Sequence, residues 1–88
     1  MDKLQTYRQE IDHIDKQLIE LLAKRFDIIK KVGKYKKDNN IPPLQSSRWQ
    51  EVLDIAKKSG EELGMNPIFI GIIWNTIHEF ALDIEKNV

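Results

Sequence analysis

Apolar residues recur at alternating steps of three and four along the first part of the chain, the spacing of one face of a long helix. The repeating positions, called here the apolar seam, are Leu4, Tyr7, Ile11, Ile14, Leu18, Leu21, Arg25, Ile28, Val32 and Tyr35. Residues 3–37 contain no proline. Leu22, Phe26 and Ile29 widen the stripe, so we expect more than one neighbour to bury this helix. At about 1.5 Å per residue it spans roughly 50 Å, which suits a helix shared by two subunits better than a compact monomer.

Two further helices are predicted after a loop over residues 38–43, which contains Pro42 and Pro43. Ser46 or Ser47 is expected to cap the second helix and Gly64 to stop it. The third runs over 67–86, from the helix-starting pair Asn66-Pro67. The apolar stripes comprise Trp49, Val52, Leu53, Ala56, Gly60 and Leu63 in the second helix, and Ile70, Ile73, Ile77, Phe80, Ala81 and Ile84 in the third. No strand pattern occurs, so residues 1–88 are predicted to form one all-α domain of three helices with a long first helix.

Composition narrows the class of protein. The 88 residues suffice for one domain with a marginal core of its own, which dimerisation would enlarge. Fourteen basic and fourteen acidic residues give zero net charge, which argues against nucleic acid or an anionic membrane as partner. No apolar run could span a bilayer and no apolar signal core begins the chain, so we expect a soluble cytoplasmic protein. With no cysteine, and with His13 and His78 lacking metal-ligand spacing, we expect no metal or cofactor and interpret both histidines as ordinary helix residues.

Arg25 is the anomaly of the apolar seam, because a buried guanidinium needs an anionic partner. A nearby acid such as Glu20 or Asp27 could supply it and set the register of packing. Alternatively, the guanidinium is placed to bind a ligand carboxylate through its two-pronged face. The pattern leaves both interpretations open.

Other cations gain meaning from their spacing to Arg25. Lys36 follows by nearly three full turns, so the two side chains could converge on a small dianion, although Lys36 also fits an exposed basic run over residues 30–37. Arg8 precedes Arg25 by about 25 Å and roughly 100° of rotation, so both cannot serve one site within a single chain. In an antiparallel dimer Arg8 could reach the partner's Arg25. Arg48 opposes the dipole of the second helix, and Glu85 lies one turn after Ala81; alone, each of these fits an exposed position.

The first helix resembles the AroQ-class chorismate mutases, whose hallmark is R-x-x-I-D-x-I-D-x-x-L-x-x-L-x-x-x-R followed by V-G-x-x-K. The matching residues are Arg8, Ile11, Asp12, Ile14, Asp15, Leu18, Leu21, Arg25, Val32, Gly33 and Lys36. The likeness continues through Arg48 and an entry to the third helix that comprises Leu63, Gly64, Pro67, Phe69 and Ile70. It therefore covers nearly the whole chain, and the first-helix motif is the specific part.

The resemblance implies an intertwined homodimer with two shared active sites that rearranges chorismate to prephenate in aromatic amino-acid biosynthesis, without a cofactor. It implies that Arg25, Arg48 and the partner's Arg8 hold the two carboxylates of this dicarboxylate substrate. Lys36 and Glu85 would approach the ether oxygen of the breaking bond. The residue set suits a pericyclic reaction, which needs positioning and charge rather than a nucleophile.

Four substrate-binding positions, Glu85 among them, depart from the usual family pattern. Trp49 stands where a glutamate generally contacts the ring hydroxyl, Gln45 replaces a frequent acid, and Ala81 replaces a common serine. Glu85 stands where bacterial members often have glutamine. Because glutamate donates a hydrogen bond only when protonated, we expect higher activity at mildly acidic pH. A flat pH–rate profile that Glu85→Gln leaves unchanged would contradict this.

Alternatives remain on the same fold. The chain could be an isochorismate-pyruvate lyase, a mutase of 4-amino-4-deoxychorismate, or a non-catalytic dimerisation or regulatory module. A basic coiled coil that binds nucleic acid fits residues 30–37 but not the zero net charge. The sequence leaves open whether the domain is free-standing or part of a fused enzyme.

Overall fold

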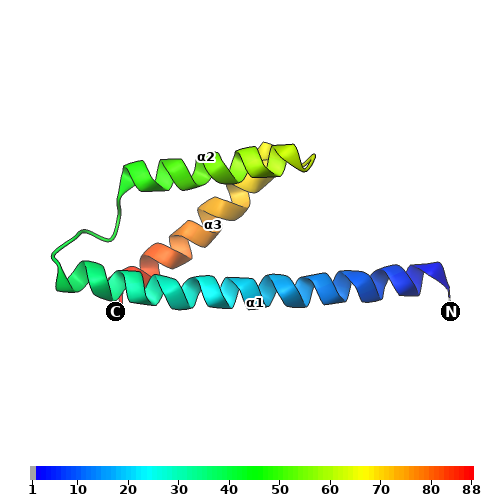
Figure 1. Ribbon diagram of the computed structural model, residues 1–88, viewed down its shortest axis with the longest axis horizontal. Coiled ribbons are helices and arrows are strands. Elements are labelled where there is room, and N and C mark those ends of the chain that lie inside the picture. The colour runs from blue at the N-terminus through cyan, green and yellow to red at the C-terminus, as the bar shows by residue number, and fades with distance from the viewer. Residues whose placement is uncertain (1) are drawn as a thin grey trace.

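A computed structural model describes residues 2–88 as three helices. These are α1 (Lys3–Asp38), α2 (Ser46–Glu62) and α3 (Pro67–Lys86), and the described residues include no strand. Figure 1 shows α1 as a long rod, with α3 running diagonally between α1 and α2. The prediction of an all-helical fold with a long first helix is therefore confirmed.

Local sequence explains where the helices begin. The Asp2 carboxylate caps α1 by accepting a hydrogen bond from the Gln5 backbone N–H at 2.8 Å, and the Asn66 side chain caps α3 in the same way through Ile68 at 2.9 Å. The predicted cap of α2 is wrong. Its N-cap is Gln45, which makes no side-chain cap bond. The helix starts early because the Gln45 carbonyl already accepts a helical bond from the Trp49 N–H at 3.0 Å.

Left-handed residues end α1 and α2. Asn40 has φ 56° after α1, and Gly64 has φ 79° after α2. In each case the next backbone N–H returns to a carbonyl five residues back: Ile41 to Lys36 and Met65 to Gly60, both at 2.8 Å. The predicted stop at Gly64 is confirmed, and the Asn40 stop fixes the start of the loop beside Lys36.

Helix α3 is the centre of packing. It contacts both α1 and α2, whereas the backbones of α1 and α2 stay apart over the described residues. The buried apolar side chains are Ile70 and Ala81, each 4% exposed. Gly60 lets α3 approach closely, since a Cβ there would lie 2.7 Å from Ile70 Cγ1.

The first half of α1 has no neighbour within the chain. Every residue from 2 to 21 is exposed, and Ile14 and Leu18 of the apolar seam are each 53% exposed. Leu63, predicted on the packed stripe of α2, is 80% exposed because it lies beyond the end of that helix. The described part of the chain contains no helix long and apolar enough to cross a bilayer.

The overall dimensions show how open this arrangement is. The chain measures 57 × 24 × 15 Å and has a radius of gyration of 16.4 Å, against about 12 Å for a compact domain of this length. Its accessible surface is 7123 Å², whereas a compact monomer of this mass has about 5,400 Å². The excess of about 1,700 Å² is largely the uncovered surface of a rod-shaped helix.

Candidate active site

Lys36 joins three segments of the chain. Its Nζ donates a hydrogen bond to the Pro43 carbonyl at 2.6 Å and pairs with Glu85 Oε1 at 2.6 Å. The two charged side chains are only 15% and 9% exposed. Glu85 Oε1 accepts no hydrogen bond of good geometry from residues 2–88, so its contact with Lys36 is charge pairing. A fixed ammonium with a carboxylate beside it therefore lies where α1, α3 and the loop meet.

Gly33 permits this approach of α3 to α1. A Cβ at this position would lie 2.8 Å from Glu85 Cα and 2.9 Å from Val88 Cγ2. The first of these atoms is backbone, so rotation of a side chain cannot relieve the contact. The absence of a side chain at Gly33 thus sets the distance between Lys36 and Glu85.

Gly33→Ala is expected to move the end of α3 away from α1 and lower stability by about 1–3 kcal/mol despite a better helix former. Gly71→Ala is the matched control, because its Cβ would meet only the flexible Lys57 Cε at 3.2 Å. Urea unfolding of both variants at one protein concentration measures the difference. Equal stability of the two would contradict this account of the close approach.

Arg25 lies partly buried on the same helix as Lys36. Its Nη1 is buried and has no hydrogen-bond partner among residues 2–88. Neither Glu20 nor Asp27, the acids considered as structural partners, forms a salt bridge with Arg25; Asp27 instead lies 4.0 Å from Lys30. An unpaired guanidinium nitrogen in a buried position is costly and has strong capacity to bind an anion.

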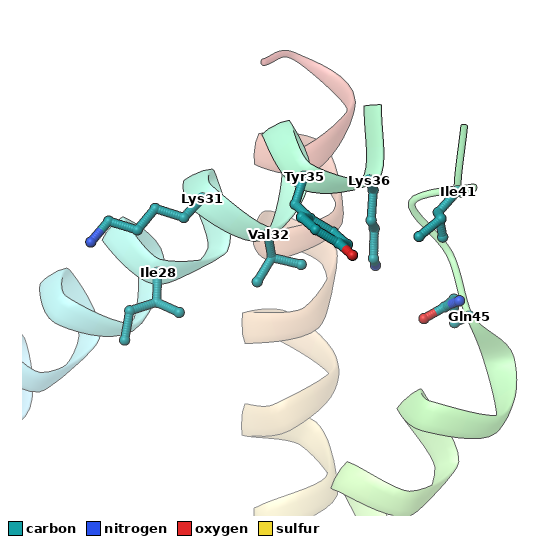
Figure 2. Close-up of a pocket in the computed structure, with 7 residues that line it drawn as sticks. All are labelled: Ile28, Lys31, Val32, Tyr35, Lys36, Ile41 and Gln45. Atoms are coloured by element: carbon teal, nitrogen blue, oxygen red, sulfur yellow. The ribbon is translucent and has the colours of Figure 1, made fainter. Parts of the chain in front are cut away.

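A pocket of about 440 Å³ lies beside this cluster, between the second half of α1 and the loop. Figure 2 shows Lys36 reaching from α1 toward Ile41 and Gln45 on the loop side. The lining of the pocket is mostly apolar. Its polar groups are the side chains of Lys31, Lys36 and Gln45 and the hydroxyl of Tyr35. Such a pocket has the size of a small-molecule site. Arg25 and Glu85 lie outside its lining, so the pocket covers only part of the candidate site.

Trp49 of α2 stacks on His78 of α3, with ring centroids 3.9 Å apart and planes inclined by 15°. Burial lowers the pKa of His78 below its ordinary value; the Glu85 carboxylate opposes this effect and Arg25 adds to it. Glu79 and Lys36 act more weakly, in the raising and lowering directions respectively. His78 is therefore neutral at pH 7 and sits within the electrostatic reach of the buried cluster.

The remaining predicted residues make no polar contact with the cluster in the single chain. Arg8 is exposed in the first half of α1, and Figure 1 shows this half of the helix extending away from its contact with α3. Arg48 is exposed and pairs with Glu51 of its own helix. Ala81 is buried one turn before Glu85 and brings no polar group. Their roles toward a substrate stay predictions.

The position of His78 beside Trp49 was not predicted. Because His78 lacks metal-ligand spacing, the sequence indicated an ordinary helix position. The available clue was its position three residues before Ala81 and seven before Glu85, which places all three on one face of α3. The contact with Trp49 could not be foreseen, since it depends on how α2 and α3 pack.

The fold and the cluster define an all-helical domain with a largely buried Lys36–Glu85 ion pair and a buried guanidinium nitrogen of Arg25 that has no partner among residues 2–88. The chain belongs to the chorismate mutase type II family, whose model matches residues 7–86.

Individual relatives agree with this membership. The T-protein of Haemophilus influenzae is 33% identical over 66 residues, which cover 75% of this chain and 18% of the relative. The 4-amino-4-deoxychorismate mutase of Streptomyces pristinaespiralis is 29% identical over 76 residues, covering 86% and 59%. A solved structure, a conserved hypothetical protein from Pyrococcus furiosus, superposes with a TM-score of 0.79 at 34% identity and 97% coverage of both chains. The chain thus spans less than a fifth of the T-protein.

Proposed function

We propose that this protein is a chorismate mutase that converts chorismate to prephenate. The observation that carries the proposal is the buried, unpartnered Nη1 of Arg25, on the same helix as the Lys36 that pairs with Glu85. The reaction is an isomerisation in which one ether C–O bond breaks while one C–C bond forms, so no atom is gained or lost. It requires no nucleophile and no cofactor.

The cluster can supply what such a rearrangement needs. Arg25 would hold a substrate carboxylate through paired charged hydrogen bonds and favour the compact, reactive conformer. Lys36, already fixed by Pro43 and Glu85, would place its ammonium near the ether oxygen, where negative charge develops. An acceleration of about 10⁶-fold corresponds to about 8 kcal/mol, a sum that conformer selection and a few charged contacts in a dry site can reach.

The proposed active form is an intertwined homodimer with shared sites. The uncovered apolar seam on the first half of α1 supports this, because covering an excess of about 1,700 Å² on each of two chains gives an interface of obligate size. A crossing of two α1 helices would also bring the partner's Arg8 toward Arg25. Arg48 would complete the carboxylate clamp, with Gln45 as a further substrate-binding residue.

A second candidate is a mutase of 4-amino-4-deoxychorismate. Two Streptomyces relatives carry that name, and one of them, from Streptomyces venezuelae, is 26% identical over 99% of this chain and 84% of its own. The absence of a carboxylate at Trp49 is compatible with either ring substituent. Relatives named bifunctional chorismate mutase/prephenate dehydratase, such as that of Aquifex aeolicus, favour chorismate as substrate and prephenate as product.

Product analysis tests the proposal directly. The purified protein is incubated separately with chorismate, 4-amino-4-deoxychorismate and isochorismate. Prephenate from chorismate is the expected result, and preferential turnover of the amino compound would shift the assignment to the second candidate. Pyruvate and salicylate from isochorismate would identify a lyase. Turnover of none of the three would leave a non-catalytic dimerisation module and refute the proposal.

A further inference from the structure

Trp49 of α2 stacks on His78 of α3. His78 lies on the same face of α3 as Ala81 and Glu85, seven residues before the carboxylate that pairs with Lys36. After burial, the pKa of His78 responds to Glu85 of its own helix and to Arg25 and Lys36 of α1, so charges from two helices act on the imidazole. The stack therefore fixes a ring at the border of the candidate active site.

The hydrogen-bonding capacity of this ring is uncommitted. Neither nitrogen of His78 takes part in a side-chain hydrogen bond among residues 2–88. Stacking occupies the face of the imidazole and leaves both nitrogens at its edge free to bond. Trp49 adds only one indole donor and no acceptor. His78 is thus the acceptor that the stacked pair can offer to a ligand.

When the charged residues are assigned to groups of the substrate, one polar group of the substrate is left without a partner. Under the proposed function, Arg25 and the other arginines bind carboxylates, while Lys36 and Glu85 face the ether oxygen. The substrate then retains one polar group, the hydroxyl on its ring. On the face of α3 that carries Ala81 and Glu85, His78 offers both an uncommitted donor and an uncommitted acceptor. A hydroxyl both donates and accepts, and a neutral imidazole does the same through its two nitrogens.

We propose that His78, oriented by its stack on Trp49, is a specificity-determining residue that hydrogen-bonds the polar substituent of the substrate ring. The inference rests on the proposed function and deepens it. Burial keeps the imidazole neutral and able to accept. The same acceptor can bind a hydroxyl or an amino group, so His78 could contact the ring substituent of either candidate substrate.

The test compares variants and substrates together. His78→Phe keeps an aromatic ring against Trp49 and removes both polar atoms, whereas His78→Asn and His78→Gln restore a donor and an acceptor near the two nitrogen positions. Each variant is assayed on chorismate and on an analogue with hydrogen in place of the ring hydroxyl. The matched control is His13→Phe, which removes the other, exposed histidine of the chain.

We expect His78→Phe to lower kcat/KM for chorismate about tenfold, the effect of one lost hydrogen bond, and to change it less than twofold for the analogue. At least one amide variant should recover most of the loss, and His13→Phe should behave as wild type. In wild-type protein, chorismate should shift the ring C–H resonances of His78 and not those of His13, a readout that does not depend on a variant folding.

Two results would overturn the inference while the proposed function stands: equal losses on both substrates without rescue, or His78→Phe with wild-type activity and no shift of the His78 resonances. Absence of chorismate turnover and binding by the wild-type protein would refute the proposed function itself, and this inference with it. The wild-type assay therefore separates the two failures.

Discussion

Arg25→Ala is expected to lower kcat/KM for chorismate by about 10³-fold or more, since it removes a charged two-pronged contact from a buried position. Arg25→Lys should recover only part of the loss, because an ammonium keeps the charge and lacks the planar fork. Steady-state kinetics on both variants measures the effect. Lys24→Ala, which removes a neighbouring exposed cation, is the control and should retain wild-type activity.

Stability distinguishes the functional role of Arg25 from a structural one. Nη1 has no partner within residues 2–88, so its removal takes away a buried group that lacks compensation. We expect the melting temperature of ligand-free Arg25→Ala to equal or exceed that of the wild type. A loss of about 3–5 kcal/mol would instead indicate a buried structural ion pair and contradict the assignment.

Mixing two inactive variants should restore activity if the sites are shared between chains. Arg8→Ala and Arg25→Ala each damage both sites of their own homodimer. In a hybrid dimer one site carries both changes and the other carries neither, so random exchange at equal amounts should recover about a quarter of wild-type activity. The measurement is activity against time after mixing, with exchange followed by mass spectrometry of differently tagged chains.

The control mixture is Arg25→Ala with Lys36→Ala, since both residues lie in the second half of α1 and serve the same proposed site from one chain. In that hybrid each site carries one of the two changes, so no intact site forms and activity should stay low. Demonstrated exchange of Arg8→Ala with Arg25→Ala without recovery would exclude the crossed geometry.

The apolar periodicity predicted the helices well, because a stripe at a spacing of three and four marks a helix face whichever partner covers that face. The bounds of α1 and the stop at Gly64 followed from local chemistry. The cap of α2 did not, because Gln45 contributes a backbone carbonyl rather than a side chain, and every residue type has one. Leu63 fitted the stripe of α2 yet lies beyond its last turn.

The candidate site was predictable where residues share a helix and unpredictable where helices meet. Arg25 and Lys36 lie on one helix, so their common face could be derived from spacing. The resemblance implied that Lys36 and Glu85 approach the same ether oxygen, but it did not predict their ion pair, which depends on the approach that Gly33 permits. Neither helix spacing nor the family resemblance predicted the stack of Trp49 on His78, because it joins α2 to α3 through side chains that are far apart in sequence.

In the proposed homodimer, the uncovered apolar seam would make folding depend on protein concentration. If half of α1 is covered only by a second copy, association supplies part of the free energy that keeps each chain folded. Dilution would then favour unfolding, because each tenfold drop in protein concentration lowers the free-energy contribution of association by about 1.4 kcal/mol. The melting temperature should rise with protein concentration. In such a homodimer, the protein concentration would determine both the fraction of folded chains and the number of complete active sites.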